Sequence, residues 1–283
     1  MGTLLTWQAQ ALPQFNPVIH PSAIIHPGAK LSPDVQVGPF VVIDGDVTLG
    51  PGCVLEPHVY LTGSTVIGAN NRFFAGCVIG GAPQDLRYKD EITGVRIGDG
   101  NVFREHVTVH RSSVVGKETV VGSHNFLMAN SHVGHNSQLG DHNILANGVL
   151  LGGHVAISDR VFLGGNAVVH QFTRLGSLSM MQGLSAISKD LPPFTVARGR
   201  NAVCGLNTVG MRRAGIGSAE RLELRKLYQA IFRSGLGLRK AAQEAREKFT
   251  SPSARLFLTF MEESARGICA ERGRRSSESD AEE

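Results

Sequence analysis

The sequence has few aromatic residues and no long hydrophobic run. Phe, Trp and Tyr make up 6% of the 283 residues, while Gly alone contributes 34. Few aromatics with many glycines and branched aliphatics favour β structure with frequent turns over a helical bundle. No apolar stretch approaches the ~20 residues that span a bilayer, and the first residues lack the basic segment and apolar core of a secretory signal. We expect a cytoplasmic protein without stable membrane insertion.

Cysteine is also scarce. The four cysteines, Cys53, Cys77, Cys204 and Cys269, form no CxxC pair and no other paired spacing. Scattered cysteines of this kind are typical of free thiols in a reducing compartment.

Charge of either sign is modest, with a formal net charge of +4, but it is unevenly spread. The segment Arg198–Arg275 holds 17 basic and 7 acidic residues. Such an excess attracts acidic protein, phosphate or nucleic acid, although ordinary solvated helix faces explain it equally well. We find neither a nucleic-acid-binding motif nor interleaved aromatics, and therefore expect no nucleic-acid partner.

A six-residue repeat organises most of the chain. An apolar residue recurs every six positions from Ile19 to Ile79, and again in the same phase from Ile97 through Val115 to Ile187. Polar Asp85 and Glu91 interrupt the series. Neither a helix of period 3.6 nor an alternating strand produces this spacing, whereas short strands joined by turns, with one side chain per block directed inward, do.

Stacked six-residue blocks form a solenoid, because single coils are unstable until their neighbours cover them. The repeats resemble those of the hexapeptide acyltransferases. That resemblance implies a mainly β protein: a left-handed parallel β-helix with three blocks per coil, followed by a small α-helical C-terminal domain.

The breaks in the period set the expected domain boundaries. We predict a lead-in over residues 1–17, the β-helix over 18–191, a helical domain over 192–270 and a disordered tail over 271–283. A loop near 81–94 and a shorter one near 111–119 should leave the rod, where loops often carry binding residues. Helical spacing predicts helices within 218–235, 237–249 and 251–270, the first capped by Ser218.

The repeat frame also positions the histidines. His132 and His135 flank the inward residue Val133, and His154 and His170 lie about one and two coils further on. Residues one coil apart stack within roughly 4.8 Å, so His135, His154 and His170 can share one edge of the rod. The number of histidines does not decide whether they form a functional site, a chance cluster or a metal site.

Six longer segments carry a closer resemblance. They are PQDLRYKDE, IGDGNVFREHVTVHR, SHNFLMANSHVGHNSQLGDHNILANGVLLGGHV, GGNAVVHQF, DLPPFTVARG and GLNTVGMRRAG. Together they resemble the UDP-N-acetylglucosamine O-acyltransferases of lipid A biosynthesis. The resemblance implies metal-independent transfer of a 3-hydroxyacyl chain from acyl carrier protein to the sugar 3-OH, without a cofactor, by a homotrimer whose sites lie between subunits.

Residue by residue, the resemblance implies a general base at His135 and an oxyanion-binding N–H at Gly153. His132 matches a sugar-binding residue. Gly183 matches the position that limits acyl length, and Arg87 stands where the family has a lysine. The remaining matched substrate-binding positions are Gln84, Asp85, His154, His170, Gln171, Asn207 and Arg213.

Three further departures keep alternatives open. Asn136 follows the base where the family usually has Asp, Val209 replaces a common Glu, and Ala214 replaces one residue of a basic pair. These changes are compatible with a 3-amino sugar acceptor or with a weakened relative that acts as a binding scaffold. A zinc enzyme of the β-helical carbonic anhydrase type is a more distant alternative, because it needs three converging imidazoles.

Overall fold

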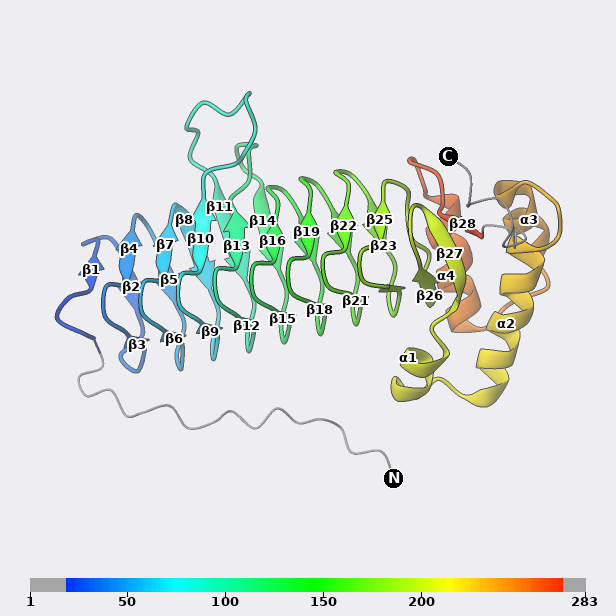
Figure 1. Ribbon diagram of the computed structural model, residues 1–283, viewed down its shortest axis with the longest axis horizontal. Helices are drawn as coiled ribbons and strands as arrows, with labels where there is room; N and C mark the ends of the chain where they lie inside the picture. Colours follow the sequence, from blue (N-terminus) through cyan, green and yellow to red (C-terminus); the bar gives the residue numbers. More distant parts are fainter. Residues whose placement is uncertain (1–18, 272–283) are drawn as a thin grey trace, which may run out of the picture.

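The computed structural model describes residues 19–271 and shows a long rod that ends in a group of helices (Figure 1). The predicted lead-in over 1–17, and the predicted tail apart from Glu271, lie outside the described residues. Within 19–271 the rod is formed by three sheets, which we call sheets 1, 2 and 3, with nine, eight and eleven strands. The predicted left-handed parallel β-helix is confirmed.

The short strands of the rod follow one another through the three sheets in turn. Sheet 1 comprises β1 Ile24–Ile25, β4 Val42–Asp44, β7 Tyr60–Thr62, β10 Val78–Gly81, β13 Thr108–His110, β16 His132–Val133, β19 Leu150–Leu151, β22 Val168–Val169 and β25 Ala186–Ile187. Sheet 2 comprises β2 Lys30–Leu31, β5 Thr48–Leu49, β8 Ser64–Ile67, β11 Gly94–Ile97, β14 Glu118–Val121, β17 Gln138–Leu139, β20 Ala156–Ile157 and β23 Arg174–Leu175. Sheet 3 comprises β3 Gln36–Val37, β6 Val54–Leu55, β9 Arg72–Phe73, β12 Val102–Phe103, β15 Phe126–Leu127, β18 Ile144–Leu145, β21 Phe162–Leu163, β24 Met180–Met181, β26 Thr195–Ala197, β27 Ala202–Leu206 and β28 Ala270–Glu271.

The turns between the sheets form three corners along the rod. Corner I joins sheet 1 to sheet 2, corner II joins sheet 2 to sheet 3, and corner III joins sheet 3 back to sheet 1. Many corner residues have a positive φ, among them Asn136 at +61° and His154 at +58°. Asparagine adopts this left-handed conformation more readily than most residues, because its short polar side chain bonds locally.

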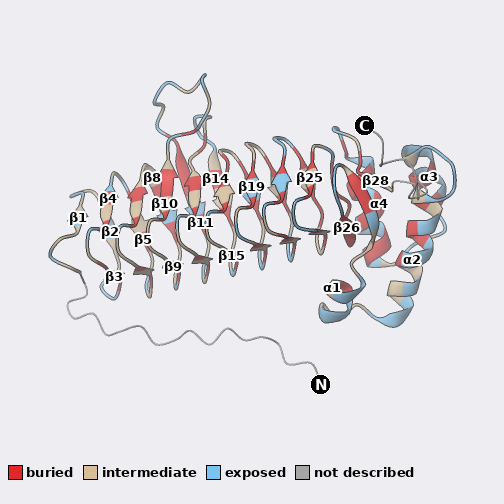
Figure 2. Ribbon diagram, viewed as in Figure 1, coloured by how far each residue is buried: buried red, intermediate tan, exposed pale blue. Residues whose placement is uncertain are grey.

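The inward residues of the repeat build the core of the rod. Leu55, Leu127 and Leu145 are at most 1% exposed, and Phe73 stacks on Phe103 with their ring centroids 4.7 Å apart. Burying one such aliphatic side chain contributes roughly 1.5–3 kcal/mol. A second inward column, two positions earlier in each block, holds smaller residues, and Cys53 and Cys77 are buried there. Figure 2 shows the burial along the strands.

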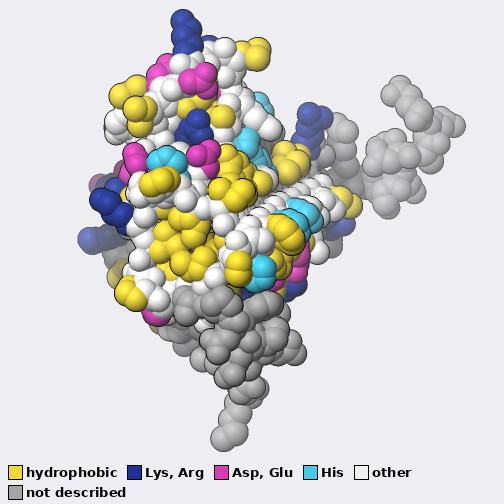
Figure 3. Space-filling model, turned by 90° about the vertical axis from the view of Figure 1, so that its left-hand side faces the viewer, with side chains coloured by type: hydrophobic (Ala, Val, Ile, Leu, Met, Phe, Trp, Pro, Cys, Tyr) yellow, Lys and Arg dark blue, Asp and Glu magenta, His cyan; other side chains and the backbone are white. Residues whose placement is uncertain are grey.

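The first coils are less completely covered. Ile19 is 45% exposed, and Ile25 and Leu31 are partly exposed. Figure 3 views the rod from its β1 end and shows hydrophobic side chains gathered on this face.

Both interruptions leave the rod at corner I and preserve the repeat phase. Leu61 pairs with Ile79 exactly one regular coil of three blocks further along the chain. The step from Ile79 to its partner Val109 contains two additional blocks, and the step from Val109 to Val133 contains one. Each insertion thus adds whole blocks to a coil. The assignment of Val115 as an inward residue was wrong: it is 68% exposed in the second insertion, which happens to keep the period.

The C-terminal region, predicted as an α-helical domain over 192–270, contains the expected helices, but it begins with the strands β26 and β27, which were not predicted. β26 extends sheet 3 by pairing with β24, so backbone donors of the last coil find partners. β27 and β28 follow, and β28 includes Glu271, which was predicted to be disordered. The helices are α1 Thr208–Arg213, α2 Ser218–Phe232, α3 Leu238–Ala245 and α4 Pro252–Glu262.

The helices pack around their own core of Leu227, Phe257 and Leu258. The cap of α2 is Gly217 and not Ser218, because the chain turns into the helix one residue earlier. The helical group is fastened to the rod by Asp190, whose buried carboxylate accepts hydrogen bonds from Arg174 and Ser264. None of the helices within residues 19–271 is long and apolar enough to cross a membrane.

A ladder of buried asparagines at corner II predicts a measurable contribution to stability. The Oδ1 atom of Asn125 accepts the backbone N–H of Asn143 at 2.7 Å, and its side chain donates to Asn101 at 3.0 Å. Replacing Asn125 with Ala leaves a buried N–H without an acceptor, which costs about 1–3 kcal/mol. We expect a lower urea midpoint at fixed protein concentration.

Ser179→Ala is the matched control for this change. Ser179 lies two coils after Asn143 in the same inward column, and its buried hydroxyl has no hydrogen-bond partner among residues 19–271. Equal destabilisation by the two substitutions would show that the ladder contributes nothing specific.

Candidate active site

Corner I brings together most of the predicted site residues. Leu151 pairs with Val133 one coil below and Val169 one coil above, so the turns that carry His135, His154 and His170 stack in order. Both insertions leave this same corner on the preceding coils. An open groove of about 750 Å³ lies on the sheet 2 side of this corner, lined in part by Val114, Asn136 and His154.

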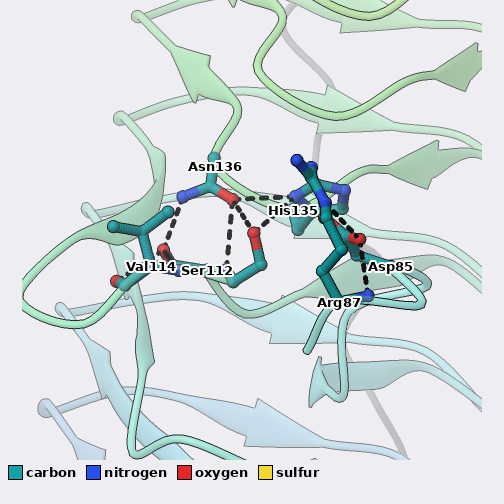
Figure 4. A network of polar contacts seen from close by, with 7 residues as sticks. Asp85, Arg87, Ser112, Val114, His135 and Asn136 are labelled. Atoms are coloured by element: carbon teal, nitrogen blue, oxygen red, sulfur yellow. Dashed lines mark hydrogen bonds and ion pairs between the residues drawn. The ribbon is translucent and has the colours of Figure 1, made fainter. Parts of the chain in front are cut away.

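The imidazole of His135 is held from one side by polar groups. Its Nδ1 lies 2.7 Å from Oδ1 of Asn136 and 3.3 Å from Oγ of Ser113 (Figure 4). The ring of His154 meets it almost perpendicularly, with centroids 5.3 Å apart. This contact confirms that the repeat frame places these two histidines on one edge.

The opposite edge of the His135 ring faces the backbone of Gly153. A Cβ atom at Gly153 would lie 2.6 Å from Nε2 of His135, closer than real Cβ atoms approach other atoms. Only glycine therefore leaves Nε2 unobstructed. The Gly153 carbonyl accepts the N–H of Phe172, whereas among residues 19–271 its own N–H donates to no protein acceptor.

The first insertion places a charged pair beside the ring. The carboxylate of Asp85 accepts hydrogen bonds from Nε and Nη2 of Arg87 at 3.2 and 3.0 Å. These bonds lower the pKa of Asp85 to about 2, with a smaller contribution from the charge of His135. The Asp85 side chain is 12% exposed and that of Arg87 is 86% exposed. Gln84 is exposed in the same loop.

His132 lies on sheet 1 beside corner I and has two partners. Its Nδ1 is 2.7 Å from Oγ1 of Thr108, and its ring meets that of His110 with centroids 4.7 Å apart. Burial, and then the charge of His135, lower the pKa of His132. Burial likewise lowers the pKa of His110 to about 4 and is the main cause of the lowered pKa of His154.

His170 and Gln171 are exposed one coil above His154. Nδ1 of His170 lies 3.5 Å from Nη2 of Arg266, which comes from the C-terminal region. Phe172, rather than His170, stacks on the His154 ring, with centroids 4.5 Å apart.

Three predicted site residues lie elsewhere in this chain. Gly183 is exposed at corner III. Asn207 caps α1 by accepting the N–H of Gly210 and donates to the carbonyl of Leu178 at corner II. Arg213 is exposed at the end of α1. One chain thus distributes the predicted site over its three corners.

The repeat did not single out His110, Ser112 or Ser113, although all three adjoin the predicted residues. His110 follows the inward residue Val109 directly, so the repeat frame contained a signal for it. The two serines belong to the second insertion, whose path the period does not define. In the part of the chain that is described, no three His, Cys, Asp or Glu side chains are grouped to hold a metal ion.

Family profiles match both parts of the chain. Residues 28–63 and 118–153 match the bacterial transferase hexapeptide repeat, and residues 190–269 match the second domain of UDP-N-acetylglucosamine O-acyltransferase.

Whole proteins match over a greater length. The acyl-[acyl-carrier-protein]–UDP-N-acetylglucosamine O-acyltransferase of Syntrophobacter fumaroxidans is 42% identical over 88% of this chain and 98% of its own. The UDP-N-acetylglucosamine acyltransferase of Francisella novicida, a solved structure, is 34% identical, covers 90% of this chain and 95% of its own, and superposes with a TM-score of 0.86. A second solved structure, from Acinetobacter baumannii, is 42% identical, covers 90% of this chain and 100% of its own, and superposes with a TM-score of 0.86. With its hexapeptide rod, its helical end and relatives matched over nearly their full length, the chain belongs to the acyl-[acyl-carrier-protein]–UDP-N-acetylglucosamine O-acyltransferase family.

Proposed function

We propose that this chain transfers a 3-hydroxyacyl group from acyl carrier protein to the 3-OH of UDP-N-acetylglucosamine, the first step of lipid A biosynthesis, with His135 as general base. The observation that carries the assignment of the base is the approach of the Gly153 backbone to Nε2 of His135. A base and a backbone N–H side by side are the two groups that acyl transfer to a hydroxyl requires.

The reaction needs a base because a sugar hydroxyl is a poor nucleophile toward a thioester. In the proposed reaction, Nε2 of His135 accepts the hydroxyl proton while the oxygen attacks the thioester carbonyl. The tetrahedral intermediate then collapses and expels the carrier thiolate, which takes the proton from the imidazolium. An imidazole suits this cycle, because it can both accept and return a proton near neutral pH.

The developing oxyanion needs a hydrogen-bond donor close to the base. The Gly153 N–H meets this need, since it donates to no protein acceptor in the described residues. Asp85 lies beside the second charge that develops, the positive charge on the His135 ring. Its carboxylate stays ionised at neutral pH and lies close enough to His135 for the two charges to interact across the corner.

His132 and His154 suit the binding of neutral sugar hydroxyls. Because their pKa values are lowered, both rings stay uncharged at neutral pH and present one donor and one acceptor. Gln84, Arg87, His170 and Gln171 surround the same corner and complete the proposed binding surface.

The positions of Gly183, Asn207 and Arg213 support an active site shared between subunits. They lie at corners II and III and in α1, whereas His135 lies at corner I of the same rod. Residues on different corners of one rod can line one site when rods pack side by side. A cyclic homotrimer provides this arrangement, and we propose it for this chain.

We also propose that the acyl donor is acyl carrier protein and that the reaction takes place in the cytoplasm. The basic C-terminal region suits an acidic acyl carrier protein. The four cysteines are free, as in a reducing cytoplasm.

The first test is acyl transfer from a panel of 3-hydroxyacyl carrier proteins to UDP-N-acetylglucosamine in the presence of EDTA. His135→Ala should lower the rate by about 10²–10⁴-fold, the usual contribution of a positioned base. His142→Ala is the control, because His142 is exposed at corner II and stacks on His124. Transfer only to the 3-amino analogue would show that the acceptor is a 3-amino UDP-sugar. If neither sugar is acylated, the protein is a binding scaffold and not this enzyme.

Gly153→Ala tests the backbone approach. The new methyl group would lie 2.6 Å from Nε2 of His135 and displace the ring or the thioester. We expect kcat to fall by roughly 10²-fold, similar to the loss of an oxyanion donor. The urea midpoint should change little, since the contact is with a side-chain end. Unchanged kcat would remove Gly153 from the mechanism.

The half-buried His110 predicts that stability falls in mild acid. Its pKa falls from 6.5 to about 4 on folding, so the unfolded chain binds its proton more readily. Its contribution to stability is therefore complete above about pH 6.5 and is lost as the pH falls toward about 4. In His110→Gln, the urea midpoint should depend less on pH across this interval. If the urea midpoint of His110→Gln depends on pH as strongly as that of the unaltered protein, His110 is not the group responsible.

A further inference from the structure

The residue beside the proposed base is an amide, and an amide has two unlike ends. A carboxylate would present an acceptor to His135 in either orientation, whereas Asn136 presents an acceptor only when Oδ1, and not Nδ2, faces the ring. We propose that Ser112 and Ser113 are positioning residues that lock the Asn136 amide and thereby fix the tautomer of His135 with its proton on Nδ1. This inference rests on the proposed function of His135.

Ser113 determines which end of the amide faces the ring. Its backbone N–H lies 3.1 Å from one side-chain atom of Asn136, and a backbone N–H can only donate. That atom must therefore be the oxygen, Oδ1. The Ser113 hydroxyl reaches the same oxygen at 2.9 Å. Turning the amide over would place two donors against each other.

Ser112 holds the other end of the amide. Its fully buried hydroxyl donates to the carbonyl of Val114 at 3.1 Å and accepts the N–H of Val114 at 3.0 Å. Since its single proton is used on that carbonyl, the hydroxyl acts toward Asn136 as an acceptor. It takes the Nδ2 donor at 2.5 Å. Figure 4 shows the whole arrangement between the second insertion and corner I.

The backbone of Asn136 is also fixed. Its N–H donates to Oγ1 of buried Thr119 at 2.8 Å, and its φ is +61°. With the residue and its amide both held, Oδ1 accepts from His135 at 2.7 Å. Nδ1 must then carry the hydrogen, which leaves the lone pair on Nε2, beside Gly153.

The second insertion therefore has a chemical task beyond shaping the groove. A neutral network of two serines and one asparagine does what a single carboxylate does because both of its oxygens accept hydrogen bonds. It sets the ring and the tautomer but adds no negative charge. Asp85, on the first insertion, contributes the negative charge on the other side of the ring.

The direct test is nitrogen NMR of the whole protein labelled with ¹⁵N-histidine, at mildly alkaline pH, with His135→Gln used to assign the signals. We expect a protonated-type shift for Nδ1 of His135 and an unprotonated-type shift for Nε2. In Asn136→Leu, which cannot bond to the ring, the two tautomers should mix. A dominant Nε2–H form in the unaltered protein would overturn the proposal. This readout does not depend on activity, so it stands even where the acyltransferase assignment fails.

The second test separates orientation from simple packing. Ser112→Ala should lower kcat about 10-fold, a part of the contribution of the base, with a smaller change in KM. In the Asn136→Asp background, which needs no amide lock, the same change should lower kcat much less. Ser179→Ala, which removes a buried hydroxyl without partners, should leave kcat unchanged. Equal losses from Ser112→Ala in both backgrounds would show a structural role only and overturn the proposal.

Discussion

The stacking of one inward side chain above another, coil upon coil, is the constraint on which the rest of this structure depends. Leu127, Leu145 and Leu163 form one such column, and each covers the side chain of the coil below. A coil shifted by one residue would turn its inward side chain to solvent and break the ladders with both neighbours. Insertions must therefore start and end in phase, as both do here. The rod is tolerant of added loops but not of changed register.

This constraint explains why chemistry is concentrated at one corner. Strict stacking makes corresponding turns of successive coils lie above one another, so residues far apart in sequence become neighbours. His135 and His154 meet in this way, and both insertions leave the rod at the same corner. The rod supplies rigid placement of the rings and the Gly153 backbone, while the insertions supply Asp85, Ser112 and Ser113. A rigid first layer with variable loops around it is a common solution for sites that demand accurate geometry.

The sequence predicted the features that follow from the period, and it failed where the chain leaves the rod. Spacing alone located the inward residues and the edge shared by His135 and His154. It misassigned Val115, because an insertion of one whole block is invisible to a repeat of the same length. The strands β26 and β27 were missed because their pairing depends on the last coil, and α1 because it is too short to show a helical period. The path of the second insertion, and hence the contacts of Ser112 and Ser113, depends on long-range hydrogen bonds that no local pattern encodes.

In the proposed reaction, Nε2 of His135 faces the acceptor hydroxyl beside the Gly153 N–H. A crystal structure of the protein with its acylated UDP-sugar product measures this most directly. We expect the 3-oxygen of the sugar within about 3 Å of Nε2, a hydrogen-bonding distance for a general base, and the acyl carbonyl oxygen directed toward the Gly153 N–H. The proposed role of His135 would be contradicted if the 3-oxygen of the product lay away from His135, or if Nε2 of His135 contacted only protein atoms.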